Sequence, residues 1–192
     1  MDNQTVTIEQ EIAEICTILK HGGIICYPTD TIWGLGCDAT NSAAVEKLYK
    51  IKERDASKSM LILVDSVDSA ARYVNDLSEV AVQLFELATE PLTIILDDAT
   101  RLARNLPAAD GTIGIRVVDH NLCTPLLRKF NKPIVSTSAN FSGEPSPSVF
   151  SEIDPRILNS VDYVVQNGRN QKAGKPSRII KLGKGGEIKI IR

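Results

Sequence analysis

The sequence predicts an α/β protein built on a twisted, mixed, open sheet that is flanked by helices. Three observations favour this class. Apolar runs of strand length intermix with segments of helical periodicity along the whole chain. The 192 residues are enough for one domain with a sizeable core. No internal repeat or convincing linker divides the chain, so we expect a single domain over residues 1–192.

The first elements are expected to alternate between helix and strand. Thr7 and Gln10 form a capping-box pattern, and apolar residues at positions 8, 12, 15 and 19 then recur at helical spacing until two glycines end the helix. The apolar residues 24–27 favour a buried strand. Asn41 is expected to cap a second helix that runs to about residue 52. No strand is predicted between these two elements.

The remaining elements follow from the same periodicities. Pro125 lies either in the first turn of a helix within residues 120–130 or at a kink in it. Two strands, 177–182 and 187–192, are expected to pair around a glycine-rich turn. The other expected elements are strands at 60–64, 92–96, 112–117, 133–137 and 161–165, and helices at 66–74 and 77–89.

Composition excludes several classes of protein. No apolar run approaches the roughly 20 residues of a membrane span, and the polar N-terminus does not resemble a signal peptide, so we expect a cytoplasmic protein without membrane contact. The four cysteines lack C-x-x-C spacing and only two histidines are present, which argues against a structural zinc site. A net charge of −2 argues against a strongly basic nucleic-acid-binding protein, although a local basic patch remains open.

Polar residues gather where three expected strands begin or end. The stretch YPTDTIWGLG follows the strand at 24–27, the basic stretch YKIKERDASK precedes the strand at 60–64, and STSANFSG ends the strand at 133–137. Each stretch alone is typical of a turn or a helix end. Together they indicate a ligand, because open α/β sheets bind ligands at strand ends. Arg116 adds a cation inside an apolar strand, where an anionic partner is expected.

The chain lacks the common nucleotide-binding and nucleophile motifs. There is no G-x-x-x-x-G-K-[ST] loop, no G-x-G-x-x-G after a strand and no G-x-S-x-G elbow. Cations and hydroxyls without a side-chain nucleophile suit an anionic ligand that carries phosphate and carboxylate groups.

Four ordered stretches, YPTDTIWGLGCDA, KIKERDASKSMLIL, GTIGIRVVDH and STSANFSGEPSP, resemble the motifs of the YrdC/Sua5/TsaC family, in its short single-domain form. The resemblance implies a YrdC-like fold and a nucleotidyltransferase, threonylcarbamoyl-AMP synthase. This enzyme would convert ATP, L-threonine and bicarbonate into threonylcarbamoyladenylate and pyrophosphate, with Mg²⁺ carried on ATP. The product would pass to a tRNA threonylcarbamoyltransferase complex for the t6A modification. Weak tRNA binding is an option that the resemblance leaves open.

The resemblance also implies roles for individual residues. Lys52 and Arg54, of the family's K-x-R element, would be catalytic by offsetting phosphate charge. The residues implied in ATP binding are Arg54, Lys58, Thr112, Ser138, Asn140, Ser146 and Arg192. Those implied in threonine binding are Thr31, Arg116, Ser136 and Ser177. No protein-bound metal is implied.

Two other functions compete with this one. A non-catalytic RNA-binding module of the same fold would show steeply salt-dependent RNA binding, but the acidic pI and few aromatic residues argue against it. A carbamoyl-adenylating domain of hydrogenase maturation would belong to a longer protein with C-x-x-C elements, which this chain lacks.

Overall fold

The computed structural model describes residues 6–54, 60–172 and 174–192. The helices are α1 (Ile8–Lys20), α2 (Ser42–Ile51), α3 (Val67–Ala70), α4 (Glu79–Leu87), α5 (Cys123–Phe130) and α6 (Pro155–Leu158), with a 3-10 turn η1 (Phe150–Glu152). The strands are β1 (Ile25–Tyr27), β2 (Gly34–Asp38), β3 (Leu61–Val64), β4 (Leu92–Leu96), β5 (Ile113–Val117), β6 (Ile134–Ser138), β7 (Tyr163–Val164), β8 (Arg178–Leu182) and β9 (Ile188–Ile190).

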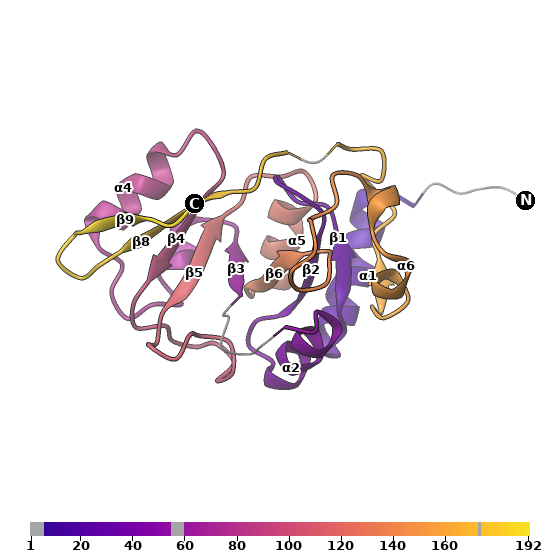
Figure 1. Ribbon diagram of the computed structural model, residues 1–192, viewed down its shortest axis with the longest axis horizontal. Helices are drawn as coiled ribbons and strands as arrows, with labels where there is room; N and C mark the ends of the chain where they lie inside the picture. Colours follow the sequence, from indigo (N-terminus) through magenta and orange to yellow (C-terminus); the bar gives the residue numbers. More distant parts are fainter. Residues whose placement is uncertain (1–5, 55–59, 173) are drawn as a thin grey trace, which may run out of the picture.

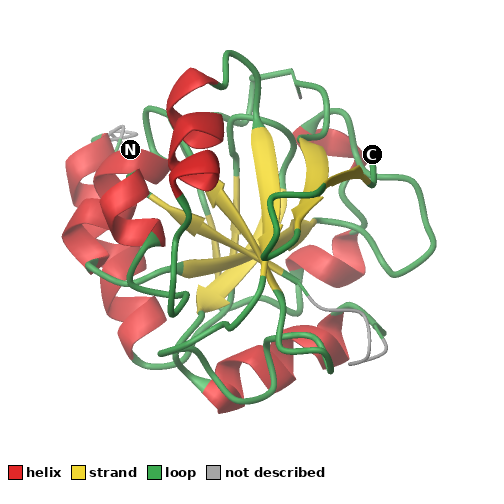
Figure 2. Ribbon diagram, turned by 90° about the vertical axis from the view of Figure 1, so that its left-hand side faces the viewer, coloured by secondary structure: helices red, strands yellow, loops and turns green. Residues whose placement is uncertain are grey.

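The described strands form one open sheet in the order β7-β1-β2-β6-β3-β5-β4-β8-β9. Three neighbouring pairs, β1/β7, β3/β5 and β4/β8, are parallel and the others are antiparallel, which confirms the mixed sheet. Figure 1 shows β8 and β9 at one side of the molecule and β1 at the other. Figure 2 looks along the sheet and shows the strands fanning out, as expected for a strong twist.

Most predicted elements are confirmed, and the capping box of Thr7 and Gln10 is present at the start of α1. Helix α5 begins at Cys123, which places Pro125 in the first turn and removes the alternative of a kink. The expected helix at 66–74 is shorter than predicted, because α3 ends at Ala70.

Strand β2 is the strand that the sequence analysis missed, and the short elements η1 and α6 were not predicted either. Its two glycines, Gly34 and Gly36, disfavour a strand on propensity alone. In the sheet, a Cβ atom on Gly36 would lie 2.7 Å from both a Tyr27 ring carbon and the Val135 carbonyl oxygen. The close approach of β1 and β6 therefore requires glycine, and pairing on both sides outweighs the weak propensity.

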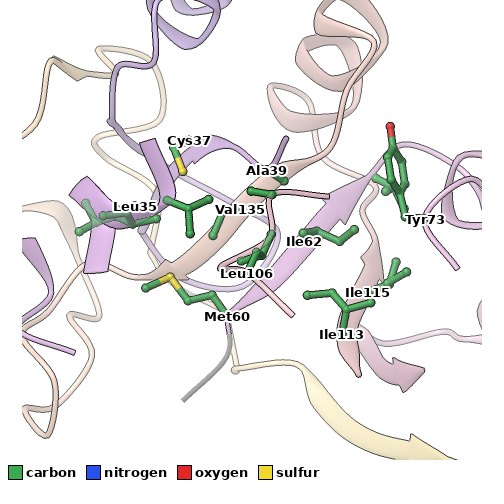
Figure 3. Packing of buried hydrophobic residues seen from close by; sticks show 14 of the residues in the cluster. Leu35, Cys37, Ala39, Met60, Ile62, Tyr73, Leu106, Ile113, Ile115 and Val135 are labelled. Atoms are coloured by element: carbon green, nitrogen blue, oxygen red, sulfur yellow. The ribbon is translucent and has the colours of Figure 1, made fainter. Parts of the chain in front are cut away.

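Two hydrophobic clusters lie on opposite faces of the sheet. On β6, Val135 joins the larger cluster, which includes Ile62 of β3 and Ile115 of β5 (Figure 3) and residues of α2 and α4. Ile134 points to the other face and joins the smaller cluster, which is formed mainly by α1 and α5. None of the described residues of β4, β5 or β8 belongs to that smaller cluster. Helices α1 and α5 thus leave this face of β4, β5 and β8 uncovered.

A buried carboxylate ties helix α1 to the segment that follows β7. Glu11 is 0% exposed and accepts hydrogen bonds from the backbone N–H groups of Gln166 and Asn167, the Asn167 side-chain amide and the Tyr163 hydroxyl. Four donors on one carboxylate fix the start of the long connection from β7 to β8.

No helix in the described part of the chain is long and apolar enough to cross a membrane.

Candidate active site

A cavity of about 250 Å³ lies on the same sheet face as α1 and α5, beside the part that these helices cover. Its floor comes from alternate residues of adjacent strands, because every second side chain of a strand points to the same face. The floor residues are Ser136 and Ser138 of β6, Leu61 of β3, Gly114 and Arg116 of β5, Thr93 and Ile95 of β4, and Ile179 of β8. The site was expected at strand ends. It lies instead over the sheet face, with the loops at those ends forming its walls.

The cavity brings together most of the residues to which the family resemblance assigns a binding role. The lining includes Thr31, Arg54, Arg116, Ser136, Ser138, Ser146, Ser177 and Arg192. Lys52, Thr112 and Asn140 are not among the lining residues. Lys58 lies outside the described residues. The roles of all these residues remain predictions, although their positions now separate those that reach the cavity from those that do not.

The charged side chains of the lining are all cationic. They are the guanidinium groups of Arg54, Arg116 and Arg192, and no Asp or Glu side chain belongs to the described lining. Hydroxyls from the floor and walls complete a polar surface. This arrangement favours a ligand with several negative charges, since guanidinium groups bind carboxylates and phosphates through paired N–H donors.

Arg116 is buried, with 3% of its surface exposed, and contacts the loop after β1. Its Nη1 donates to the Thr31 hydroxyl at 3.1 Å, and its Nη2 lies 3.2 Å from Asp30 Oδ1. The sequence predicted an anionic partner for this arginine, and within the protein that partner is Asp30. Burial raises the pKa of Asp30, and the charge of Arg116 opposes that shift.

The PTDT loop holds its two threonine hydroxyls in a local network. Thr29 Oγ1 accepts from the Thr31 backbone N–H at 3.1 Å and donates to the Ile32 carbonyl at 2.8 Å. The two hydroxyl oxygens lie 3.0 Å apart. Both threonines line the cavity, so the local turn fixes the direction in which the Thr31 hydroxyl is presented.

Trp33, the aromatic residue of the same motif, is buried in the larger hydrophobic cluster. It is 2% exposed and its ring packs on Phe150, with 4.9 Å between ring centroids. The guanidinium carbon of Arg169 lies 4.5 Å from the centroid of the same Phe150 ring, in a cation–π contact. Trp33 is therefore a packing residue of the core and does not line the cavity.

Lys52 has a position that the sequence analysis did not anticipate. Its side chain is 1% exposed, and Nζ donates to the Ser138 carbonyl at 2.5 Å and to the Asn140 carbonyl. Burial, followed by the charge of Arg54, lowers its pKa to about 8. The expected direct contact of Lys52 with phosphate finds no support in this geometry. The ammonium group instead fastens the segment after β6, on which Ser138 and Asn140 lie.

Asn140 and Thr112 are likewise engaged within the protein. Asn140 Nδ2 donates to the carbonyls of Phe141 and Glu144, which shapes the loop that carries Ser146. The Thr112 hydroxyl donates to Asp110 at 2.7 Å. This hydrogen bond and the contact with Lys181 lower the pKa of Asp110 to about 2. Neither side chain is among those that line the cavity in this structure, and the ATP contacts expected of them stay predictions.

Arg192 is tied back to β8. Its carbonyl accepts from the Ile179 N–H at 2.8 Å, and its Nε donates to the Ser177 carbonyl at 3.3 Å. The Ser177 hydroxyl in turn pairs with the Thr93 hydroxyl at 2.8 Å, buried within the protein. Thr93 was missed in the sequence, where its only signal was a single hydroxyl in the apolar run LTIIL.

Comparisons with known proteins identify the family to which this chain belongs. Residues 17–192 match the Sua5/YciO/YrdC family model, which is described as "Telomere recombination". A putative threonylcarbamoyl-AMP synthase of Methanocaldococcus jannaschii is 38% identical over 91% of this chain and 83% of its own length. A threonylcarbamoyl-AMP synthase of Pseudoalteromonas translucida is 32% identical over 82% of this chain and 86% of its own length.

Solved structures agree on the fold. E. coli YciO superposes with a TM-score of 0.82 at 27% identity, covering 94% of this chain and 87% of YciO. P. abyssi Sua5 in complex with L-threonine superposes with a TM-score of 0.85 at 22% identity and 98% coverage of this chain, which spans 55% of that Sua5 chain. Since the family model covers most of the sequence and curated relatives exceed 30% identity, the chain belongs to the Sua5/YciO/YrdC family.

Proposed function

We propose that the protein is a threonylcarbamoyl-AMP synthase, which condenses L-threonine, bicarbonate or CO₂, and ATP into threonylcarbamoyladenylate and pyrophosphate. The names of the curated relatives support this activity. One structural observation carries most weight: three guanidinium groups and several hydroxyls converge on one cavity whose described lining has no carboxylate. Such a cavity suits substrates that together carry a carboxylate and a triphosphate.

The chemistry requires no nucleophile from the protein. The amine nitrogen of threonine attacks the carbon of CO₂ and loses a proton, which gives a carbamate. A carbamate oxygen then attacks the α-phosphorus of ATP, and the bond to the bridging oxygen breaks with the electron pair leaving on pyrophosphate. The protein has to position the reactants, balance their charge and exclude water from two labile species.

We assign these tasks to individual residues from their positions around the cavity. Arg116 and Thr31, which lie together, would hold the threonine carboxylate and hydroxyl. Arg54 and Arg192, from other walls of the cavity, would balance the phosphates. Ser138 would contact the nucleotide from β6, held by Lys52 through its own carbonyl. Lys58, which the sequence also implies, lies outside the described residues.

Mg²⁺ would enter with ATP. The described residues contain no group of three His, Cys, Asp or Glu side chains that could hold a metal ion, and the described lining offers no carboxylate ligand. The described residues therefore offer no magnesium site of their own, and phosphate oxygens of the nucleotide would supply the ligands.

The decisive experiment measures pyrophosphate release by the purified protein. Release should require ATP, L-threonine and bicarbonate together, and mass spectrometry during turnover should find the chain unmodified. Release without threonine, or a stable adduct of AMP with the protein, would contradict the proposal. We further propose a cytoplasmic location and transfer of the labile product to a tRNA-modifying threonylcarbamoyltransferase. None of the observations favours an RNA-binding module.

A further inference from the structure

Asp30 occupies an unusual place beside the cavity. It lies in the PTDT loop between two threonines that line the cavity, yet it is not itself among the lining residues. Its carboxylate contacts Arg116, which does line the cavity. We propose that Asp30 is an internal counter-ion that competes with the carboxylate of the amino-acid substrate for Arg116, and so lowers the affinity and selectivity of the site for carboxylates. This inference rests on the proposed function for the identity of the substrate.

Arg116 keeps its position without help from Asp30. Its backbone belongs to β5, which pairs with β3 on one side and β4 on the other. Its side chain is 4% exposed, and Nη1 donates to the Thr31 hydroxyl. These contacts hold the guanidinium group in the cavity floor, so loss of the Asp30 charge leaves the group in place.

The contact between the two charged groups is an ion pair more than a hydrogen bond. Asp30 Oδ1 lies 3.2 Å from Nη2, but this buried oxygen has no hydrogen bond of acceptable geometry within the described residues. The Nε of Arg116 is also buried without a partner there. The guanidinium group therefore retains donor capacity for a ligand, which Asp30 does not saturate.

The two possible influences of Asp30 have opposite signs. Orientation of Arg116 through Nη2 would help a ligand, but it depends on hydrogen-bond geometry, which is poor here. Repulsion between Asp30 and a ligand carboxylate on the same guanidinium opposes binding and needs no particular geometry. Burial of the pair strengthens this repulsion by excluding water. Repulsion therefore dominates.

The competition has a benefit for the free enzyme. A buried arginine without a counter-charge is strongly destabilising, and Asp30 supplies that charge when the cavity holds no substrate. The burial-raised pKa of Asp30 agrees with a carboxylate that is only partly compensated by Arg116. A substrate carboxylate then binds reversibly, because it shares a cation that is already balanced.

The test compares L-threonine with L-threoninamide, which replaces the carboxylate by a neutral group of the same shape. Selectivity is the Kd for threoninamide divided by the Kd for threonine, measured by calorimetry. Asp30→Asn keeps the shape and an acceptor oxygen but removes the charge. We expect it to raise selectivity about tenfold or more, since a charge at this range shifts an ionic equilibrium by about one to three powers of ten.

The control variant is Asp119→Asn. Asp119 is exposed, and its charge is also felt by Asp30, but it forms no ion pair with Arg116 among the described residues. We expect its selectivity to equal that of the wild type. An unchanged or lower selectivity in Asp30→Asn would overturn the inference, as would an equal rise in both variants.

A measurement with the native aspartate covers the case in which Asp30→Asn does not fold. The charged or titrating groups that act on Asp30 are Arg116 in β5 and His120 and Asp119 after it. The Cys123 thiol and the Tyr27 phenol also interact with Asp30, but burial raises the pKa of both groups, so they stay neutral below about pH 7. The experiment therefore uses a His120→Gln background, so that no imidazole titrates. Burial raises the pKa of Asp30 above the ordinary value of about 4, so lowering the pH from neutral to about 4 protonates at least half of this carboxyl group. Selectivity for the carboxylate should rise over this range, and a flat profile down to about pH 4 would overturn the inference.

The inference and the proposed function can fail separately. If the wild type releases pyrophosphate as proposed but Asp30→Asn shows no gain in selectivity, the inference alone is wrong. If no release occurs but the gain is seen, the proposed reaction is wrong while Asp30 remains the counter-ion of a carboxylate site.

Discussion

Replacing Lys52 by methionine separates a positioning role from direct phosphate binding. The Lys52 ammonium group donates to the carbonyls of Ser138 and Asn140. Methionine fills a similar volume, so the cavity cost is small. Two buried carbonyls lose their donor, at about 1–3 kcal/mol each. Part of this loss is offset, because methionine removes the cost of burying a charged ammonium group, the same burial that lowers the pKa of Lys52 to about 8. We therefore expect a net loss of about 2–3 kcal/mol in the free energy of unfolding.

The loss should be visible without any ligand. For a chain of this size about 1 kcal/mol shifts the Tm by about 2–4 °C, so Lys52→Met should melt about 4–12 °C below the wild type. The control is Lys50→Met, because Lys50 is exposed and, among the residues that the structure describes, its ammonium group pairs only with Glu46 one turn away. We expect its Tm to change by less than about 2 °C.

The kinetic constants complete this test. If Lys52 positions the segment after β6, Lys52→Met should raise the KM for both ATP and threonine, because Ser136 and Ser138 line the cavity and are proposed to contact threonine and the nucleotide, respectively. An unchanged Tm together with a selective loss of ATP binding would refute the argument and return Lys52 to the phosphates.

Three further predictions concern separate parts of the chain. Arg54→Ala should lower activity about 10- to 100-fold, the value of a lost charge-assisted hydrogen bond, while Lys50→Ala stays active; equal losses would indicate a diffuse positive surface. Arg192→Ala should weaken ATP binding in calorimetry with little change in the ligand-free Tm, and unchanged ATP affinity would remove it from the site. Glu11→Gln should cost about 2 kcal/mol in urea unfolding, because one amide oxygen cannot serve four donors; an unchanged midpoint would contradict the anchoring role.

The sequence predicted the fold well where apolar periodicity was strong. Short apolar runs located the strands of the sheet, and the cap of α1 could be named to the residue. Strand β2 was not predicted because its glycines give no periodic signal. Glycine is required there because β1 and β6 pack closely against Gly36. That packing is set by tertiary structure, which local patterns do not contain.

The site could be predicted only in part for a related reason. Ser136 and Ser138 were named through the family resemblance, and because they alternate along β6 both lie on the sheet face that lines the cavity. A basic residue in a loop gives no such direction. Lys52 and Arg54 are two residues apart, but one ammonium group turns inward to carbonyls while the guanidinium reaches the cavity. Only the folded chain distinguishes these two cases.

The all-cationic lining has a practical consequence for the composition of the buffer. Three guanidinium groups around a cavity of about 250 Å³ will attract whatever small anions the solution contains. Apparent substrate affinities should therefore fall as salt rises. At equal ionic strength phosphate should lower them more than chloride, because phosphate binds guanidinium groups directly, whereas simple screening would affect both salts equally. The pyrophosphate product carries the highest charge of the small anions present and should be the strongest competitor. Turnover would then slow as it accumulates, and a pyrophosphatase added to the reaction should restore the initial rate.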